Sequence, residues 1–275
     1  MPDDVYLYSL PYFWVMSTAK YAFAFLSSTP MRAEPTDRSE MVNVVLFGEA
    51  FEILERQPKW IKIRLQHDGY EGWMDPQMCI VISEEEYERI RTAPKYFNSA
   101  TAGEIEDKNG RVFSLTKGAC FPGMKGNEVK IGSHEFHFNG PLQNSAKDRN
   151  TLIETALSYT GTPYLWGGRT TFGIDCSGFT QMVYRMNGIY LPRDASQQAK
   201  KGTTLSFLEE CQPGDLAFFD NAEGAIVHVG IVMEDYKIIH ASGRVRIDTL
   251  DHSGIYNEEL GKHTHKLRVL KSLID

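Results

Sequence analysis

The order of structural patterns along the chain is the strongest constraint on its fold. In residues 31–83, apolar runs are short, recur about every ten residues and are separated by turn-forming residues, as in small β domains, and residues 95–145 again show a pattern of short strands with glycine turns. From residue 147 onward, segments with helical periodicity come first and strand-like segments follow. Helices that precede a contiguous antiparallel sheet predict an α+β domain over residues 147–275.

Residues 31–83 carry the clearest strand pattern. Ile61, Ile63 and Leu65 occupy every second position of "WIKIRL", which is the period of two expected of a half-buried strand. An Asp-Gly pair follows in "HDGYEGW", and glycine there tolerates the positive φ of a tight turn. We therefore expect a hairpin whose return strand begins at "YEGW".

Two further segments complete the first half of the chain. The sequence "EEEYERIRTAP" at 84–94 predicts a short amphipathic helix or linker that ends before its proline. Residues 95–145 again have the pattern of short strands with glycine turns, so we expect a second small β unit. The predicted domains are residues 1–92, 93–146 and 147–275.

Composition and charge exclude several classes of protein. Hydrophobic residues make up 42% of the chain and the mean hydropathy is −0.34, which is too polar for a membrane protein. The formal net charge is −7, whereas nucleic acids and anionic lipids require basic surfaces. We therefore expect no nucleic-acid partner and no membrane span.

The apolar stretch at 12–26, "YFWVMSTAKYAFAFL", has neither the charge pattern of a signal peptide nor the length of a span. Lys20 interrupts it, and Asp3 and Asp4 stand where a signal peptide carries positive charge. We interpret it as extended, aromatic-rich structure packed on a domain.

The four cysteines give no metal-binding pattern. Cys79, Cys120, Cys176 and Cys211 lie at least 35 residues apart, so there is no CxxC pair and no zinc-ribbon spacing. We therefore predict neither a metal nor a cofactor. The default interpretation of each cysteine is a small buried hydrophobic residue.

Three helices are predicted after residue 147. In "NTLIETALSYTG" an apolar stripe follows Asn150, which we expect to cap the helix. In "DCSGFTQMVYRMNG" apolar residues recur at i, i+3, i+4 and i+7, and Asp175 precedes them. In "PRDASQQAKKG" Asp194 stands three residues before Gln197, which is a capping-box pattern.

Cys176 falls in the first turn of the second of these helices. Unpaired N–H groups and the helix dipole favour negative charge there by about 0.3–1 kcal/mol, which helps to form a nucleophilic thiolate. The charge of Asp175 opposes the thiolate, so a nearby histidine is needed as general base or as ion-pair partner.

His228 and His240 are the best candidates for that histidine. The sequences "AIVHVGIVM" and "KIIHAS" have the pattern of strands joined by a turn at "EDY", which makes the two histidines cross-strand neighbours on one face. One can then orient the other beside the nucleophile. The alternative is a pair of structural histidines in the sheet. The remaining six occupy turns, strands or polar tail sequence with no evident partner: His67, His134, His137, His252, His263 and His265.

Six motifs occur in the order of a known family. The sequences "GTPYLWGG", "DCSGF", "PRDASQQ", "PGDLAFF", "HVGIVM" and "IIHASG" resemble the NlpC family of cell-wall cysteine endopeptidases, which have a papain-like core. The resemblance implies Cys176 as nucleophile, His228 as base and His240 as the third polar residue. In the first half, "RAEP", "VLFGE" and "DGYEGW" resemble a bacterial SH3-like barrel. The expected fold is thus a papain-like α+β domain preceded by two small all-β SH3-like barrels.

The resemblance also implies roles for residues around the nucleophile. Tyr164 matches a tyrosine near the oxyanion hole, with a core aromatic residue as the alternative. Ser177 and Asp194 match substrate-contacting positions, and Asp194 is expected to bind the free amine of an N-terminal L-Ala.

Two residues of the first β unit are implied at the amine-binding end of the site. Tyr70 of "DGYEGW" matches a tyrosine that reaches over the active site and closes that end. Glu34 of "RAEP" is expected to add a second carboxylate. Glu40 is its rival, and a solvated surface glutamate is the alternative for Glu34.

The whole chain resembles the γ-D-glutamyl-L-diamino acid endopeptidases of this family. The resemblance implies hydrolysis of the bond between γ-linked D-Glu and diaminopimelate or Lys in small wall peptides, with release of L-Ala-D-Glu during peptidoglycan turnover. A non-catalytic wall-binding module and a papain-like amidase or acyltransferase are the alternatives. Without a leader the chain fits a cytoplasmic recycling role, and with a lost leader it fits the cell envelope equally well.

Overall fold

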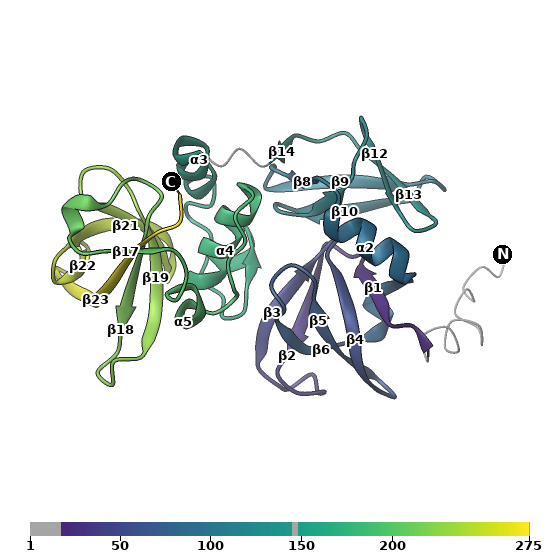
Figure 1. Cartoon of the computed structure of the whole chain (residues 1–275), viewed down its shortest axis with the longest axis horizontal. Coiled ribbons are helices and arrows are strands. Elements are labelled where there is room, and N and C mark those ends of the chain that lie inside the picture. The colour runs from purple at the N-terminus through teal and green to yellow at the C-terminus, as the bar shows by residue number, and fades with distance from the viewer. Residues whose placement is uncertain (1–17, 145–147, 275) are drawn as a thin grey trace. The chain divides into compact units, whose positions relative to one another are not determined.

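The computed structural model describes residues 18–144 and 148–274. The chain divides into two compact units, residues 1–141 and 142–275, shown in purple to teal and in teal to yellow in Figure 1. Residues 12–17 of the N-terminal apolar stretch lie outside the described residues, and the stretch continues as a fully buried strand, β1 (Tyr21–Ala24). Among the described residues, every helix is too short or too polar to cross a membrane.

The first unit opens with an antiparallel sheet in the order β3-β2-β6-β5-β4-β1-β7. Gly69 joins β5 to β6 with φ of +74°, and its N–H donates to the carbonyl of Leu65 (3.0 Å). Ile61, Ile63 and Leu65 are buried, so the predicted half-buried strand and its hairpin are confirmed. The remaining bounds are β2 (Ser28–Arg32), β3 (Met41–Leu46), β4 (Ala50–Gln57), β5 (Trp60–Leu65), β6 (Glu71–Met74), the 3-10 turn η1 (Pro76–Met78) and β7 (Cys79–Ile82).

A helix and two smaller sheets complete the first unit. The helix α2 (Glu84–Thr92) begins at Ser83, whose hydroxyl accepts from the N–H of Glu86 (3.1 Å). One small sheet has the order β10-β9-β13-β12, and β8 pairs with β11. Their bounds are β8 (Lys95–Asn98), β9 (Ala102–Asp107), β10 (Val112–Thr116), β11 (Cys120–Pro122), β12 (Glu128–Ile131) and β13 (His134–Phe138).

One hydrophobic core joins both parts of this unit. The ring of Phe47 packs on Phe121 and Phe136, with ring centroids 6.1 and 5.3 Å apart. Gly48 follows with φ of +79°, and a Cβ there would lie 1.8 Å from the carbonyl oxygen of Cys120. The predicted domain boundary between residues 92 and 93 stays a prediction.

The second unit begins with short elements and helices. It contains β14 (Leu142–Asn144), α3 (Arg149–Leu157), β15 (Arg169–Thr170), β16 (Gly173–Ile174), α4 (Cys176–Met186), α5 (Ala195–Gln198), β17 (Thr203–Leu205) and the 3-10 turn η2 (Leu208–Glu210). Figure 1 shows α3, α4 and α5 on one side of the sheet that follows. The central helix α4 packs against strands of that sheet and is buried along its whole length.

One predicted helix cap is wrong, whereas Asp194 is the N-cap residue of α5 as predicted but makes no side-chain cap bond. The cap of α3 is Asp148 rather than Asn150, because the helix already begins at Arg149 and the Asp148 carboxylate accepts from the N–H of Thr151 (2.9 Å). At α5 the Asp194 carboxylate forms no cap hydrogen bond. That helix spans only 195–198, and the Asp194 carbonyl accepts both of its first bonds at 3.0 Å.

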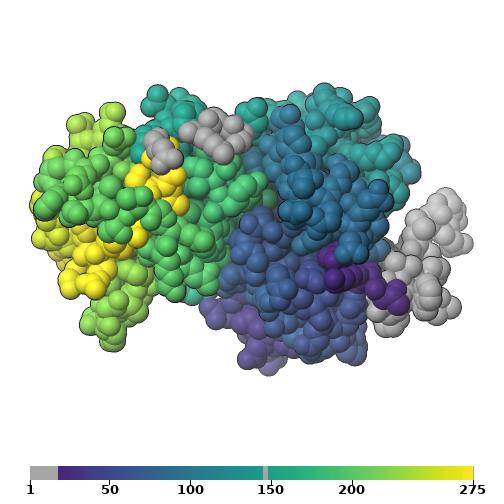
Figure 2. Space-filling view, in the orientation of Figure 1, coloured from purple at the N-terminus to yellow at the C-terminus, as the bar shows by residue number. Residues whose placement is uncertain are grey.

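The sheet of the second unit closes into a barrel. Its order is β17-β23-β18-β19-β20-β21-β22, and β23 also pairs with β22, so six strands form a ring. The bounds are β18 (Leu216–Asp220), β19 (Ile226–Val232), β20 (Lys237–Ser242), β21 (Arg244–Asp251), β22 (Gly254–Asn257) and β23 (Lys262–Ser272). Figure 2 shows part of the C-terminal segment, in yellow, at the surface of this unit. The α+β papain-like prediction is confirmed.

Candidate active site

Asp175 fixes the start of α4 and thereby the position of Cys176. Its carboxylate accepts from the N–H groups of Gly178 (2.6 Å) and Gly167 (2.8 Å) and forms a buried ion pair with Arg193 (2.9 Å). A Cβ at Gly178 would lie only 2.3 Å from a carbonyl oxygen of the preceding loop, so this turn of helix requires glycine. Asp175 is therefore a structural cap that holds the cysteine as the first helical residue.

The Cys176 thiol is buried beside strand β19. Burial raises its pKa to about 11, and the charge of Asp175 adds to that increase. Hydrogen bonds from the backbone N–H groups of Val229 and Ser177 lower the pKa of the thiol. The sulfur therefore lies beside Val229, the residue that follows His228. Because the thiol is neutral at rest, attack on a carbonyl requires a base that removes its proton.

His228 and His240 contact each other directly, as predicted. Nε2 of His228 lies 2.8 Å from Nδ1 of His240, and both side chains are buried. They are diagonal rather than opposite neighbours, because Gly230 is the residue paired with His240. A Cβ at Gly230 would lie 2.9 Å from the Cβ of His240 and 2.7 Å from a methyl of Ile238. The glycine of "HVG" therefore makes room for the histidine pair.

The chain of hydrogen bonds continues to Asp248, which the sequence interpretation missed. Oδ2 of Asp248 lies 3.0 Å from Nε2 of His240, and Nη2 of Arg246 donates to its other oxygen at 2.9 Å. Burial tends to raise the pKa of the Asp248 carboxyl. Hydrogen bonds from His240 and Arg246 have the larger opposite effect, so the pKa lies below its usual value. An ionised carboxylate is thus hydrogen-bonded to the second histidine of the pair, His240.

His265 is a third imidazole in this cluster, although the sequence suggested no partner for it. Its ring stacks on that of His228 with centroids 4.1 Å apart. Burial, followed by the charges of His240 and His265, lowers the pKa of His228 well below 6.5. One ring nitrogen from each of His228, His240 and His265 lies within 4.8 Å of the other two, a spacing that could hold a metal ion; this holds for the described residues.

Tyr164 lies close enough to the Cys176 thiol to interact with it, whereas the Ser177 hydroxyl forms hydrogen bonds with two buried protein side chains. Burial raises the pKa of the Tyr164 hydroxyl to about 12, and the next largest cause is Cys176. The Ser177 hydroxyl donates to Asp175 (3.3 Å) and accepts from Arg193 (2.9 Å). Their predicted roles in oxyanion stabilisation and substrate contact stay predictions, as does amine binding by the half-buried Asp194.

Tyr70 and Glu34 belong to the first unit. The half-buried Tyr70 packs on the core of the first sheet, and its N–H donates to the Asp68 carboxylate (2.9 Å). Glu34 and its rival Glu40 are both exposed in the segment between β2 and β3. Their predicted roles at a site in the second unit stay predictions.

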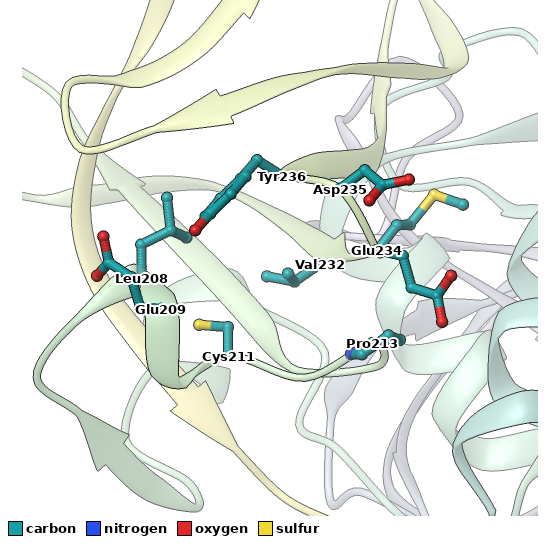
Figure 3. A pocket seen from close by; sticks show the side chains of 9 residues that line it. Leu208, Glu209, Cys211, Pro213, Val232, Glu234, Asp235 and Tyr236 are labelled. Atoms are coloured by element: carbon teal, nitrogen blue, oxygen red, sulfur yellow. The ribbon is translucent and has the colours of Figure 1, made fainter.

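A pocket of about 370 Å³ lies elsewhere in the second unit, between η2 and the turn that joins β19 to β20 (Figure 3). Figure 3 shows the Cys211 sulfur and the Tyr236 ring at this pocket. Burial raises the pKa of the Cys211 thiol to about 12, which makes it a poor nucleophile. The pocket lining includes none of the predicted site residues.

Comparisons with known proteins agree with this architecture. The NlpC/P60 family model matches residues 161–264, and the model of the bacterial dipeptidyl-peptidase SH3 domain matches residues 31–77. A γ-D-glutamyl-L-lysine dipeptidyl-peptidase of Bacillus subtilis is 31% identical over 78% of this chain and 78% of its own length. A protein of the same name from Bacillus cereus is 28% identical over 82% of this chain and 75% of its own length.

The fold comparison covers nearly the whole chain. The crystal structure of an NlpC/P60 family protein from Bacillus cereus superimposes with a TM-score of 0.76 at 20% identity, covering 93% of this chain and all of that one. A buried cysteine at a helix start, beside a histidine pair in an antiparallel barrel, is the arrangement of a papain-like cysteine peptidase. The chain belongs to the NlpC/P60 family of cysteine peptidases.

Proposed function

We propose that this protein hydrolyses the bond between γ-linked D-Glu and an L-diamino acid in short cell-wall peptides that carry a free N-terminal L-Ala. The observation that carries the proposal is the buried relay from His228 through His240 to Asp248 beside the helix-start cysteine. The names of the two Bacillus relatives support the same bond type, with lysine as the diamino acid.

The chemistry follows from the neutral resting state of the site. His228 takes the thiol proton as the sulfur of Cys176 bonds to the γ-carbonyl carbon of D-Glu, and the oxyanion is stabilised by the Cys176 N–H and the Tyr164 hydroxyl. The C–N bond then breaks as His228 returns the proton to the leaving amine. Water activated by His228 hydrolyses the thioester and releases L-Ala-D-Glu.

Selection of a free amine is the second part of the proposal. Asp194 is the N-cap residue of α5 and follows Arg193, which is bound to Asp175 at the start of α4. A carboxylate there forms a charge-assisted hydrogen bond with the L-Ala ammonium group. Tyr70 and Glu34 would close the same end of the site. A closed amine-binding end selects small free peptides over intact cell wall.

The amine requirement is tested with two forms of one peptide. L-Ala-γ-D-Glu-L-Lys and its N-acetylated form are each incubated with the full chain, and products are followed by mass spectrometry. We expect cleavage of the free peptide and at least a hundredfold lower kcat/KM for the acetylated one, because the acetyl group removes the charge bound by Asp194. Equal cleavage of both peptides would refute amine selection.

A further inference from the structure

We propose that Asp248 is a positioning residue that sets, through His240, which nitrogen of His228 carries the proton. The inference rests on the proposed function only for the identity of the substrate. It concerns three buried side chains on three neighbouring strands, β19, β20 and β21. Asp248 contacts His240 but not the reacting atoms, so its effect on catalysis is indirect.

The first step is the tautomer of His240. An ionised carboxylate can only accept hydrogen bonds, so Nε2 of His240, 3.0 Å from Oδ2 of Asp248, must carry a proton and donate it. A neutral imidazole has one donor and one acceptor nitrogen. Nδ1 of His240 is therefore the acceptor.

The second step passes this constraint to His228. Nε2 of His228 lies 2.8 Å from the acceptor nitrogen of His240, so it must be the protonated nitrogen of its own ring. This leaves Nδ1 of His228 with a free lone pair. That nitrogen is then the only one of the ring that can take the proton of Cys176.

Arg246 keeps Asp248 in the form that this arrangement needs. Its guanidinium lies 2.8 Å from one carboxylate oxygen and donates to the other at 2.9 Å. Arg246 also pairs with Glu259 (2.8 Å), which holds the guanidinium in place. Although burial opposes it, the bonds from His240 and Arg246 lower the pKa of the Asp248 carboxyl, which favours its ionised form.

The direct test is a measurement of the histidine tautomers in the resting protein. Nitrogen NMR on protein labelled at the histidine rings, above pH 6.5 and without substrate, is expected to show both His228 and His240 protonated at Nε2 only. Protonation of either ring at Nδ1 would overturn the proposal. Because no substrate is used, this result is independent of which bond the enzyme cleaves.

The functional test compares Asp248→Asn with Asp248→Ala and Asp248→Glu. The asparagine amide can donate to Nε2 of His240, which favours the opposite tautomer in both rings, so we expect kcat to fall roughly 10²–10⁴-fold. Asp248→Ala imposes no tautomer and is expected to retain more activity than Asp248→Asn, although it is the larger structural change. Asp248→Glu is expected to recover part of the loss.

Asp251→Asn is the matched control. Asp251 lies on the same strand and also binds an imidazole, that of His263 (2.8 Å), but outside the candidate site. We expect its kcat to stay within about twofold of the unmodified chain. An Asp248→Asn enzyme as active as this control would contradict the proposal. If the tautomers are as stated but no peptide is cleaved, the proposed function fails and the positioning role stands.

Discussion

Burial keeps both Cys176 and His228 in their neutral forms. The thiol has a pKa of about 11, and the pKa of the imidazole lies well below 6.5. Both shifts favour the neutral thiol and the neutral imidazole, so we expect proton transfer to accompany attack. At Cys176, where the sequence suggested thiolate stabilisation, desolvation of the buried sulfur outweighs the N–H groups of Val229 and Ser177, which favour the thiolate.

The pH dependence of kcat/KM follows from the same groups. Only neutral His228 can accept the thiol proton, so activity is present above its pKa and is lost as pH falls through that value. Burial lowers this pKa most, followed by the charges of His240 on β20 and His265 on β23, and Cys176 lies on α4, which packs against β19. We expect the acidic midpoint of the kcat/KM profile below pH 6.5. A midpoint at or above 6.5 would contradict a buried neutral base.

Asp175 is a residue whose removal affects stability more than an ordinary helix cap. Asp175→Ala leaves the buried guanidinium of Arg193 without its carboxylate, so we expect a loss of about 3–5 kcal/mol in the free energy of unfolding, measured with urea. Asp148→Ala removes the cap of α3, where the carboxylate is exposed, and serves as the control with a smaller loss. Equal losses in the two variants would show that the ion pair contributes nothing.

Among the elements, those with local signals were predictable and those set by strand register were not. The hairpin at Gly69 and helix α4 follow from turn chemistry and apolar periodicity. Apolar side chains of a strand are expected to be buried and charged ones exposed. In strand β21 the opposite holds, because Ile247 is 41% exposed while Asp248 is buried. No local pattern marks such a residue, because its partner His240 lies on another strand.

Strands β19 and β20 pack closely because Gly230 is paired with His240. Gly230→Ala places a methyl against His240 and Ile238, so we expect a loss of about 1–3 kcal/mol in stability and at least tenfold in kcat. Val227→Ala is the control, since Val227 is on the same strand and 52% exposed. Unchanged kcat in Gly230→Ala would show that the histidine pair does not depend on this close packing.

For the whole molecule, the papain-like domain and the SH3-like region were predictable because their motifs lie close together in sequence. Closure of the barrel was not, because β23 pairs with both β18 and β22 and thereby brings His265 onto His228. A histidine in a polar C-terminal strand has no sequence signal for that contact. The predicted roles of Tyr70 and Glu34 in substrate binding stay predictions, because these residues belong to the first unit and Cys176 belongs to the second.

We propose that Cys176 is the nucleophile that cleaves the γ-D-Glu–diamino acid bond. The most direct measurement is mass spectrometry of L-Ala-γ-D-Glu-L-Lys, and of its diaminopimelate counterpart, after incubation with the full chain and with Cys176→Ala. We predict L-Ala-D-Glu and the free diamino acid from the unmodified chain with at least one of these peptides, and neither product from a folded Cys176→Ala variant. Intact peptides, cleavage at another bond, or equal product from the variant would show that Cys176 does not catalyse this reaction.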